Sequence, residues 1–111
     1  MRIYVAHPYS DDPAANIERV RAICRAVVDE GHVPIAPHLF LPAFVDEATE
    51  RDLALRLCTE LVGGCDALWF YGTRISPGME REISTAQARG IPVVNRLFRH
   101  APDPTQPTEN R

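Results

Sequence analysis

Two patterns of apolar residues alternate along this chain. Short runs rich in β-branched and aromatic residues lie at 2–6, 32–37, 65–72 and 91–95, and each predicts a strand. The third run, CDALWFYG, is almost entirely apolar, which is typical of a strand covered on both faces of a sheet. The segments between the runs repeat apolar residues at steps of three and four, which is the period of an amphipathic helix.

Residues that start and stop helices bound these segments. The first helix is predicted to begin after Asp12, its amino-terminal cap, and to end before Gly31. The second is predicted between Asp46, as its cap, and the glycine pair at 63–64. The third follows the third strand and is predicted to end before Gly90.

Two stretches fall outside this alternation. The segment 37–46, PHLFLPAFVD, is apolar but broken by prolines, which predicts an irregular loop with a short turn. We expect its apolar part, LFLPAFV (39–45), to act as a lid or a subunit contact. Residues 99–111 are rich in proline and polar residues, which predicts a disordered tail, and 1–98 are expected to form one domain.

The order strand, helix, strand, helix, strand, helix, strand predicts an α/β fold with right-handed crossovers. We expect three layers, with helices on both faces of a flavodoxin- or Rossmann-like parallel sheet of four to five strands in the order 2-1-3-4. Such sheets bind ligands beyond the carboxyl ends of the strands, where the strand order reverses. The loops after strands 1 and 3, AHPYSDD and YGTRISPG, are therefore expected to meet at the binding site.

Composition narrows the classes of partner. The chain has 111 residues and a formal net charge of −3, so it lacks the basic surplus expected of a protein that binds a nucleic acid polymer or an anionic membrane. Apolar runs stay short of the roughly 18–20 residues of a membrane span, and the amino terminus does not resemble a signal peptide. Cys24, Cys58 and Cys65 are expected to be reduced thiols in a cytoplasmic protein. The histidines and cysteines show no metal-ligand spacing, and we expect neither metal nor cofactor.

The stretch ISPGMEREIS, residues 75–84, carries two glutamates with different expected environments. With Ser76 as the cap of the third helix, the residues that face the core are Met79, Ile83 and Ala86. Glu82 borders this stripe, whereas Glu80 points towards solvent. Free N–H groups at the helix start favour an ionised carboxylate, and Gly78 lets a ligand approach the backbone. Glu82 is thus a candidate nucleophile, although glutamates are also simply common near helix starts.

Other candidates lie in the same loops and after strand 2. His7 and His38 are candidate general acids near neutral pH, with capping or surface roles as the alternative. Tyr9 is a candidate to stack on a base or close the pocket, with loop packing as the alternative. Asp66, at the start of strand 3, is expected to be structural, and Arg74 is a weaker candidate for a phosphate contact.

The motifs IYVAHPYS, CDALWFYG and SPGMEREISTA together resemble the nucleoside 2-deoxyribosyltransferase-like family. Members of that family carry I-Y in the first strand, an Asp that opens the third, and G-x-x-x-E-[LI]-x-x-A at the next helix. Gly78, Glu82, Ile83 and Ala86 fill the last pattern at the correct spacing. The resemblance covers residues 2–95 and is greatest to a small branch of the family, for which it implies no settled activity.

The resemblance implies an N-glycosidase or (deoxy)ribosyltransferase that acts on a nucleoside or a nucleoside 5′-monophosphate. Glu82 would attack the anomeric carbon and displace the base, giving a covalent glycosyl–carboxylate that passes the sugar to water or another base. Tyr4 would position the nucleophile and the sugar, and Ser76 and Gly78 would line the sugar or its 5′ end. A 5′-phosphate would be held by Ser76, the helix N–H groups and Ser10. Relatives are commonly oligomers, so a homodimer or larger homo-oligomer is expected.

One position departs from the family pattern. Many relatives carry an Asp eight residues before the strand-3 Asp, and it contacts the base or sugar, whereas this chain has Cys58 there. Asp46, Glu50 and Asp52 are candidates to replace that carboxylate. Otherwise departure of the base is assisted in a different way, or the chain is a non-catalytic module that binds a nucleotide-derived ligand. A phosphoribohydrolase of the cytokinin-activating type is a further alternative, although that family usually shows P-G-G-x-G-T-x-x-E and this chain has one glycine before the glutamate.

Overall fold

A four-stranded parallel sheet organises residues 1–97, the part of the chain that this computed structural model describes. The strands are β1 (Arg2–Ala6), β2 (Val33–Ile35), β3 (Ala67–Gly72) and β4 (Val93–Leu97). Their order is β2-β1-β3-β4, and all three pairings are parallel. The predicted α/β fold and its 2-1-3-4 order are confirmed, while the predicted tail, 99–111, lies outside the described residues.

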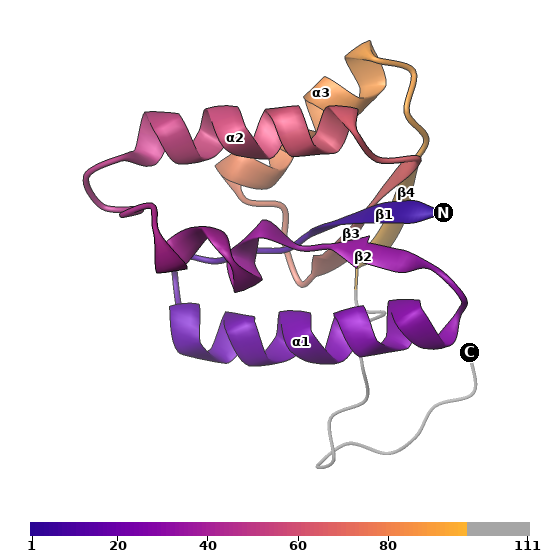
Figure 1. The fold of residues 1–111 in the computed structure, drawn as a ribbon, viewed down its shortest axis with the longest axis horizontal. Coiled ribbons are helices and arrows are strands. Elements are labelled where there is room, and N and C mark those ends of the chain that lie inside the picture. Colours follow the sequence, from indigo (N-terminus) through magenta and orange to yellow (C-terminus); the bar gives the residue numbers. More distant parts are fainter. Residues whose placement is uncertain (98–111) are drawn as a thin grey trace.

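Three helices cover the two faces of the sheet, as Figure 1 shows. They are α1 (Pro13–Asp29), α2 (Arg51–Gly63) and α3 (Pro77–Ala88). The α1 helix packs against one face, and α2 and α3 pack side by side against the other. The three layers expected from the sequence are therefore present.

Side chains of the central strands alternate between these two faces, because successive residues of a strand point in opposite directions. Ile3 packs with Val20 on the α1 face, whereas Tyr4 and Leu68 pack with Met79 on the face of α2 and α3. Each of these side chains is at most 1% exposed, and full burial of one such apolar side chain contributes about 1.5–3 kcal/mol. The alternation thus directs Tyr4 into the layer that contains α3.

Two of the three predicted helix caps are observed. Asp12 and Ser76 each accept a hydrogen bond from the backbone amide three residues later, and they cap α1 and α3. The prediction for Asp46 was wrong, because α2 begins only after Glu50. The Asp46 side chain instead accepts a hydrogen bond from the amide of Ala48 at 2.9 Å, within a turn that precedes the helix.

The apolar segment 37–46 is more regular than expected. It contains two single-turn 3-10 helices, η1 (Pro37–Leu39) and η2 (Leu41–Ala43). Leu41 and Val45 are buried against Ala54 of α2, whereas the side chain of Phe44 is 69% exposed. The segment is therefore anchored to the core along one side, and its role as a lid or subunit contact stays a prediction.

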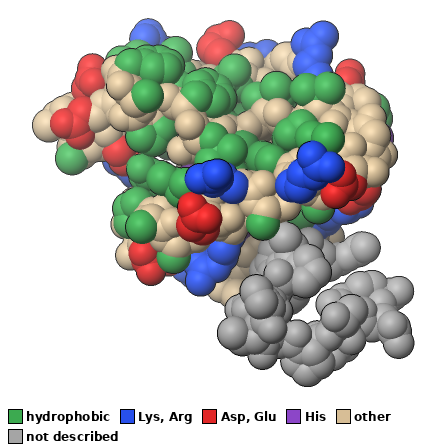
Figure 2. Space-filling view, turned by 60° about the horizontal axis from the view of Figure 1, so that its bottom comes forward, with side chains coloured by type: hydrophobic (Ala, Val, Ile, Leu, Met, Phe, Trp, Pro, Cys, Tyr) green, Lys and Arg blue, Asp and Glu red, His purple; other side chains and the backbone are tan. Residues whose placement is uncertain are grey.

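The described surface mixes charges of both signs. On the face shown in Figure 2, arginine side chains lie among Asp and Glu side chains rather than in one basic patch. Two ion pairs lie within α1: Arg21 with Glu18 at 3.5 Å and Arg25 with Asp29 at 2.9 Å. Within residues 1–97, no helix is long and apolar enough to cross a membrane.

Candidate active site

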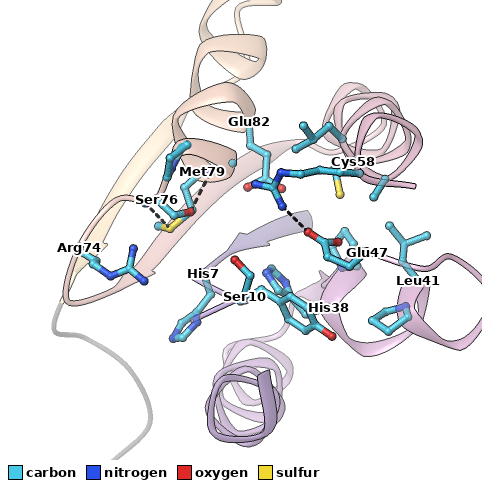
Figure 3. Close-up of a pocket in the computed structure, with 18 residues that line it drawn as sticks. His7, Ser10, His38, Leu41, Glu47, Cys58, Arg74, Ser76, Met79 and Glu82 are labelled. Atoms are coloured by element: carbon cyan, nitrogen blue, oxygen red, sulfur yellow. Dashed lines mark hydrogen bonds and ion pairs between the residues drawn. The ribbon is translucent and has the colours of Figure 1, made fainter. Parts of the chain in front are cut away.

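A cavity of about 150 Å³ opens beyond the carboxyl ends of β1 and β3. Its walls come from the loop after β1, the η1–η2 segment, the start of α2 and the loop that leads into α3 (Figure 3). The two loops approach each other at Gly72, which ends β3 with φ +105°. A Cβ on Gly72 would lie 2.9 Å from Cδ of Pro8, so only glycine allows this contact. The loops predicted to meet at the reversal of strand order do meet there.

Nearly all of the predicted site residues line this one cavity. They are His7, Tyr9, Ser10, His38, Ser76, Gly78 and Glu82. Tyr4 does not line it: this side chain lies behind the cavity, fully buried in β1, and its hydroxyl donates a hydrogen bond to Oε2 of Glu82. The structure thus places the predicted residues together, and their roles in catalysis and binding stay predictions.

Glu82 supplies the buried carboxylate of the cavity. It is 7% exposed because it shares the inward face of α3 with Met79, three residues earlier. Burial raises the pKa of Glu82 from 4.5 to about 7, opposed by hydrogen bonds from Tyr4 and Cys58 and reinforced by the charge of Glu47. Both protonation states of Glu82 are therefore populated near neutral pH.

The two donors beside Glu82 are neutral. Burial and then the charge of Glu82 raise the pKa of Tyr4 well above its ordinary value, so the phenol keeps its proton. The same two causes raise the pKa of the Cys58 thiol to about 11. Cys58 lines the cavity from α2, at the position where a carboxylate was expected from the family pattern. A thiol at this position donates to Glu82 without adding a second negative charge.

The predicted histidines lie on the wall formed by η1 and the loop after β1. The ring of His38 packs 5.5 Å from that of Tyr9. Burial, together with the charge of His7, lowers the pKa of His38 to about 4, so this ring is neutral at pH 7. That disfavours His38 as a general acid near neutral pH and leaves it as a hydrogen-bonding group. Nδ1 of His7 lies 2.8 Å from a backbone carbonyl oxygen, that of Pro8.

Sequence reasoning missed Glu47 and Arg51, two charged residues that line the cavity. They form an ion pair with an N···O distance of 2.8 Å. The three candidates to replace the family carboxylate, Asp46, Glu50 and Asp52, do not line the cavity. The acidic run VDEATERD indicated that a carboxylate lies near the site. Which of its acidic residues faces the cavity depends on the turn before α2.

A polar network holds the loop after β1. Asn16 is 3% exposed, and its Nδ2 donates to the carbonyl oxygen of Tyr9 at 3.0 Å and to Oδ1 of Asp11 at 2.7 Å. Asp11 in turn forms an ion pair with Arg74 at 2.8 Å. Arg74 is thereby held at the edge of the cavity, which it also lines.

The space next to the cavity is larger and more open. A groove of about 880 Å³ adjoins it, and the two share Tyr9, Ser10, Pro42, Glu47 and Arg51. Pockets that bury drug-sized ligands enclose about 300–1,000 Å³, so a ligand of that size would fill the cavity and extend into the groove. Among residues 1–97, no group of three or more His, Cys, Asp or Glu side chains is placed to hold a metal ion.

Fold and site together define a class of protein: a three-layer α/β protein with a buried carboxylate in a cavity where the order of its parallel strands reverses. A family model described as Domain of unknown function (DUF7768) matches residues 1–96, and the chain belongs to this family. No curated protein matches the sequence significantly.

A similar solved structure is that of a 2-deoxyribosyltransferase from the psychrotolerant bacterium Bacillus psychrosaccharolyticus. The match has a TM-score of 0.69 and 19% sequence identity, and it covers 86% of this chain and 71% of the other. That enzyme is described as a suitable biocatalyst for the industrial synthesis of antiviral and antitumoral nucleosides. At this level of identity, the likeness shows a shared fold.

Proposed function

We propose that this protein cleaves or transfers the N-glycosidic bond of a nucleoside or a nucleoside 5′-monophosphate, with Glu82 as the nucleophile. The observation that carries the proposal is the buried carboxylate of Glu82, which Tyr4 holds from behind and which lines the cavity in front. Two further findings support it: the spacing of Gly78 and Glu82 in the sequence, and the fold shared with a 2-deoxyribosyltransferase.

The arrangement suits a displacement at the anomeric carbon in two halves. Because Tyr4 binds Oε2 of Glu82, the carboxylate is oriented before a substrate arrives, and Oε1 is the proposed attacking atom. In the first half, the new bond from C1′ to this oxygen forms as the bond from C1′ to the base nitrogen breaks. In the second, water or an acceptor base displaces Glu82 and takes the sugar.

Binding roles are proposed for the residues around this carboxylate. Ser76, Gly78 and the first N–H groups of α3 would hold the sugar and its 5′ end, with Ser10 contributing from the opposite loop. The ring of Tyr9 would stack on the base where the cavity opens into the groove. The substrate would thus span both spaces, with its reacting carbon at the buried end.

Chromatography of reaction mixtures tests the proposal. A panel of nucleosides and their 5′-monophosphates, ribose and deoxyribose, is incubated with and without a free acceptor base. We expect release of the base from at least one substrate. The rate of this release should fall by about 10³-fold or more in Glu82→Ala and Glu82→Gln. Glu80→Gln is the matched control, because Glu80 lies on the same helix and is exposed.

Two results would reject this proposal. Release of base by Glu82→Ala at the wild-type rate would show that Glu82 is not the nucleophile. Binding of a nucleotide by the wild-type protein without any release of base, measured by calorimetry beside the same panel, would make the chain a non-catalytic binding module.

A further inference from the structure

We propose that Glu47 is the acid/base residue of this reaction, which protonates the departing base and deprotonates the acceptor. The inference rests on the proposed function and supplies what a nucleophile alone lacks. A base nitrogen leaves slowly as an anion, and water attacks slowly as a neutral molecule. A positioned proton donor and acceptor contributes about 10²–10⁴-fold to such steps.

Glu47 and Glu82 face the same space from different elements. Both line the cavity, and Figure 3 shows the Glu47 side chain turned into it, across from Glu82. The charge of Glu47 raises the pKa of Glu82, so the two carboxylates interact electrostatically. The Glu47 side chain is 37% exposed to solvent, whereas Glu82 is buried. Two carboxylates in different environments around one reacting bond divide into nucleophile and acid/base.

The turn before α2 presents Glu47 to the cavity. The amide of Asp46 donates to Oε1 of Glu50 at 3.0 Å, and the amide of Ala48 donates to Oδ1 of Asp46 at 2.9 Å. The carboxylates on either side of Glu47 are therefore engaged within the turn. That of Glu47 instead accepts a hydrogen bond from Arg51 at 2.8 Å, which holds the side chain at the cavity wall.

Other titratable groups around the cavity are less suited to this role. The thiol of Cys58, with a pKa of about 11, and the phenol of Tyr4, whose pKa is higher than usual, hold their protons at neutral pH. His38 has a pKa of about 4, so at neutral pH it is not protonated to the imidazolium cation and cannot serve as the acid. His7 is 3% exposed, and its Nδ1 is engaged with a backbone carbonyl oxygen. Glu47 combines access to solvent with a place opposite the nucleophile.

The proton passes through Glu47 once in each half of the reaction. When the C1′–N bond breaks, its electron pair stays on nitrogen and takes the proton of Glu47 while Glu82 bonds to C1′. In the second half, the Glu47 carboxylate takes a proton from water or from the N–H of an acceptor base. The electron pair so freed bonds to C1′, and the pair of the broken C1′–O bond returns to Glu82.

Leaving groups that need no protonation separate the two roles. N7-methylated purine nucleosides carry a positive charge on the base and depart without an acid, whereas ordinary nucleosides require one. In the first turnover, we expect Glu47→Gln to slow release of the base from ordinary nucleosides by about 10²–10⁴-fold and release from N7-methylated ones far less. Glu82→Gln should slow both. Asp52→Asn, which is exposed and does not line the cavity, should slow neither.

A covalent readout distinguishes Glu47 from a residue that only supports the fold. With an N7-methylated substrate, Glu47→Gln should accumulate a glycosyl adduct on Glu82 that intact-protein mass spectrometry detects, since water is no longer deprotonated. Azide, a nucleophile that needs no deprotonation, should restore turnover and yield the glycosyl azide. Glu47→Ala serves as a second variant, and circular dichroism confirms folding of both.

The outcomes separate the inference from the proposed function. Equal loss of first-turnover release with both kinds of substrate in Glu47→Gln, or no loss with either, would overturn the role of Glu47 and leave that of Glu82 standing. Failure of the wild-type protein to release base from any substrate would overturn the proposed function, and this inference with it.

Discussion

Replacing Glu82 by Gln is expected to stabilise the folded protein at alkaline pH while removing its proposed activity. Folding raises the pKa of Glu82 from 4.5 to about 7, mainly through burial, so the folded state binds this proton more tightly than the unfolded chain does. Below pH 4.5 the group is protonated in both states and has no effect. As the pH rises from 4.5 to 7, the unfolded chain releases the proton first, so the free energy of unfolding falls. Above pH 7 the whole destabilisation by ionised Glu82 remains.

The magnitude follows from the two pKa values. Each factor of ten between the folded and unfolded dissociation constants corresponds to about 1.4 kcal/mol, so ionised Glu82 destabilises the fold by about 3 kcal/mol. Gln is nearly isosteric, stays neutral, and keeps an oxygen that accepts the hydrogen bond from Tyr4. The free energy of unfolding of Glu82→Gln should therefore exceed that of the wild type by about 3 kcal/mol at pH 8.5 and by less than about 0.5 kcal/mol at pH 4.5.

Urea unfolding at the two pH values measures this difference. The single tryptophan, Trp69, is 6% exposed and reports on unfolding through its fluorescence. Glu80→Gln, on the exposed side of α3, should change the free energy of unfolding by less than about 0.5 kcal/mol at both pH values. A stabilisation by Glu82→Gln that is the same at pH 4.5 and 8.5, or a loss of stability at pH 8.5, would refute the argument that burial raises this pKa.

Three further predictions concern the same site. Tyr4→Phe removes the hydrogen bond that lowers the pKa of Glu82, so this pKa should rise. With an N7-methylated substrate, the pH of half-maximal activity should therefore rise, and the rate at pH 7 should fall by about tenfold or more. Gly78→Ala should fold normally, since its Cβ would meet nothing nearer than 4.0 Å, but should weaken binding in calorimetric titrations because the methyl group enters the cavity wall. Ser76→Ala removes the amino-terminal cap of α3, so its free energy of unfolding in urea should be about 1 kcal/mol lower than that of the wild type. Ser84→Ala, at an exposed position of the same helix, should lower it less.

Much of the fold follows from local sequence. Apolar runs and helical periods predicted the four strands and the three α-helices of the described residues, with strand ends displaced by up to two residues and the start of α2 displaced by four. The 3-10 helices η1 and η2 were expected only as an irregular loop with a short turn. The caps at Asp12 and Ser76 were correct because a cap bonds to an amide three residues away, within reach of a local pattern. The cap predicted at Asp46 was wrong for a related reason. Its side chain accepts a hydrogen bond from the amide two residues later, which closes a turn instead of starting a helix.

The candidate site was predictable in part. The strand order places the loops after β1 and β3 together, so seven of the eight predicted residues line one cavity. The sequence did not indicate which member of the acidic run before α2 would join them. That choice depends on the turn closed by Asp46 and Glu50, which directs the intervening Glu47 inward.

The sequence by itself determined the α/β class, the strand order and the helix that carries Glu82, because periodicity and capping act over a few residues. Only the tertiary structure decided the chemical state of that carboxylate. Its hydrogen bond to Tyr4 joins residues 78 positions apart, and its raised pKa comes mainly from burial in the folded chain. Such long-range contacts depend on how the layers pack, which no local pattern specifies.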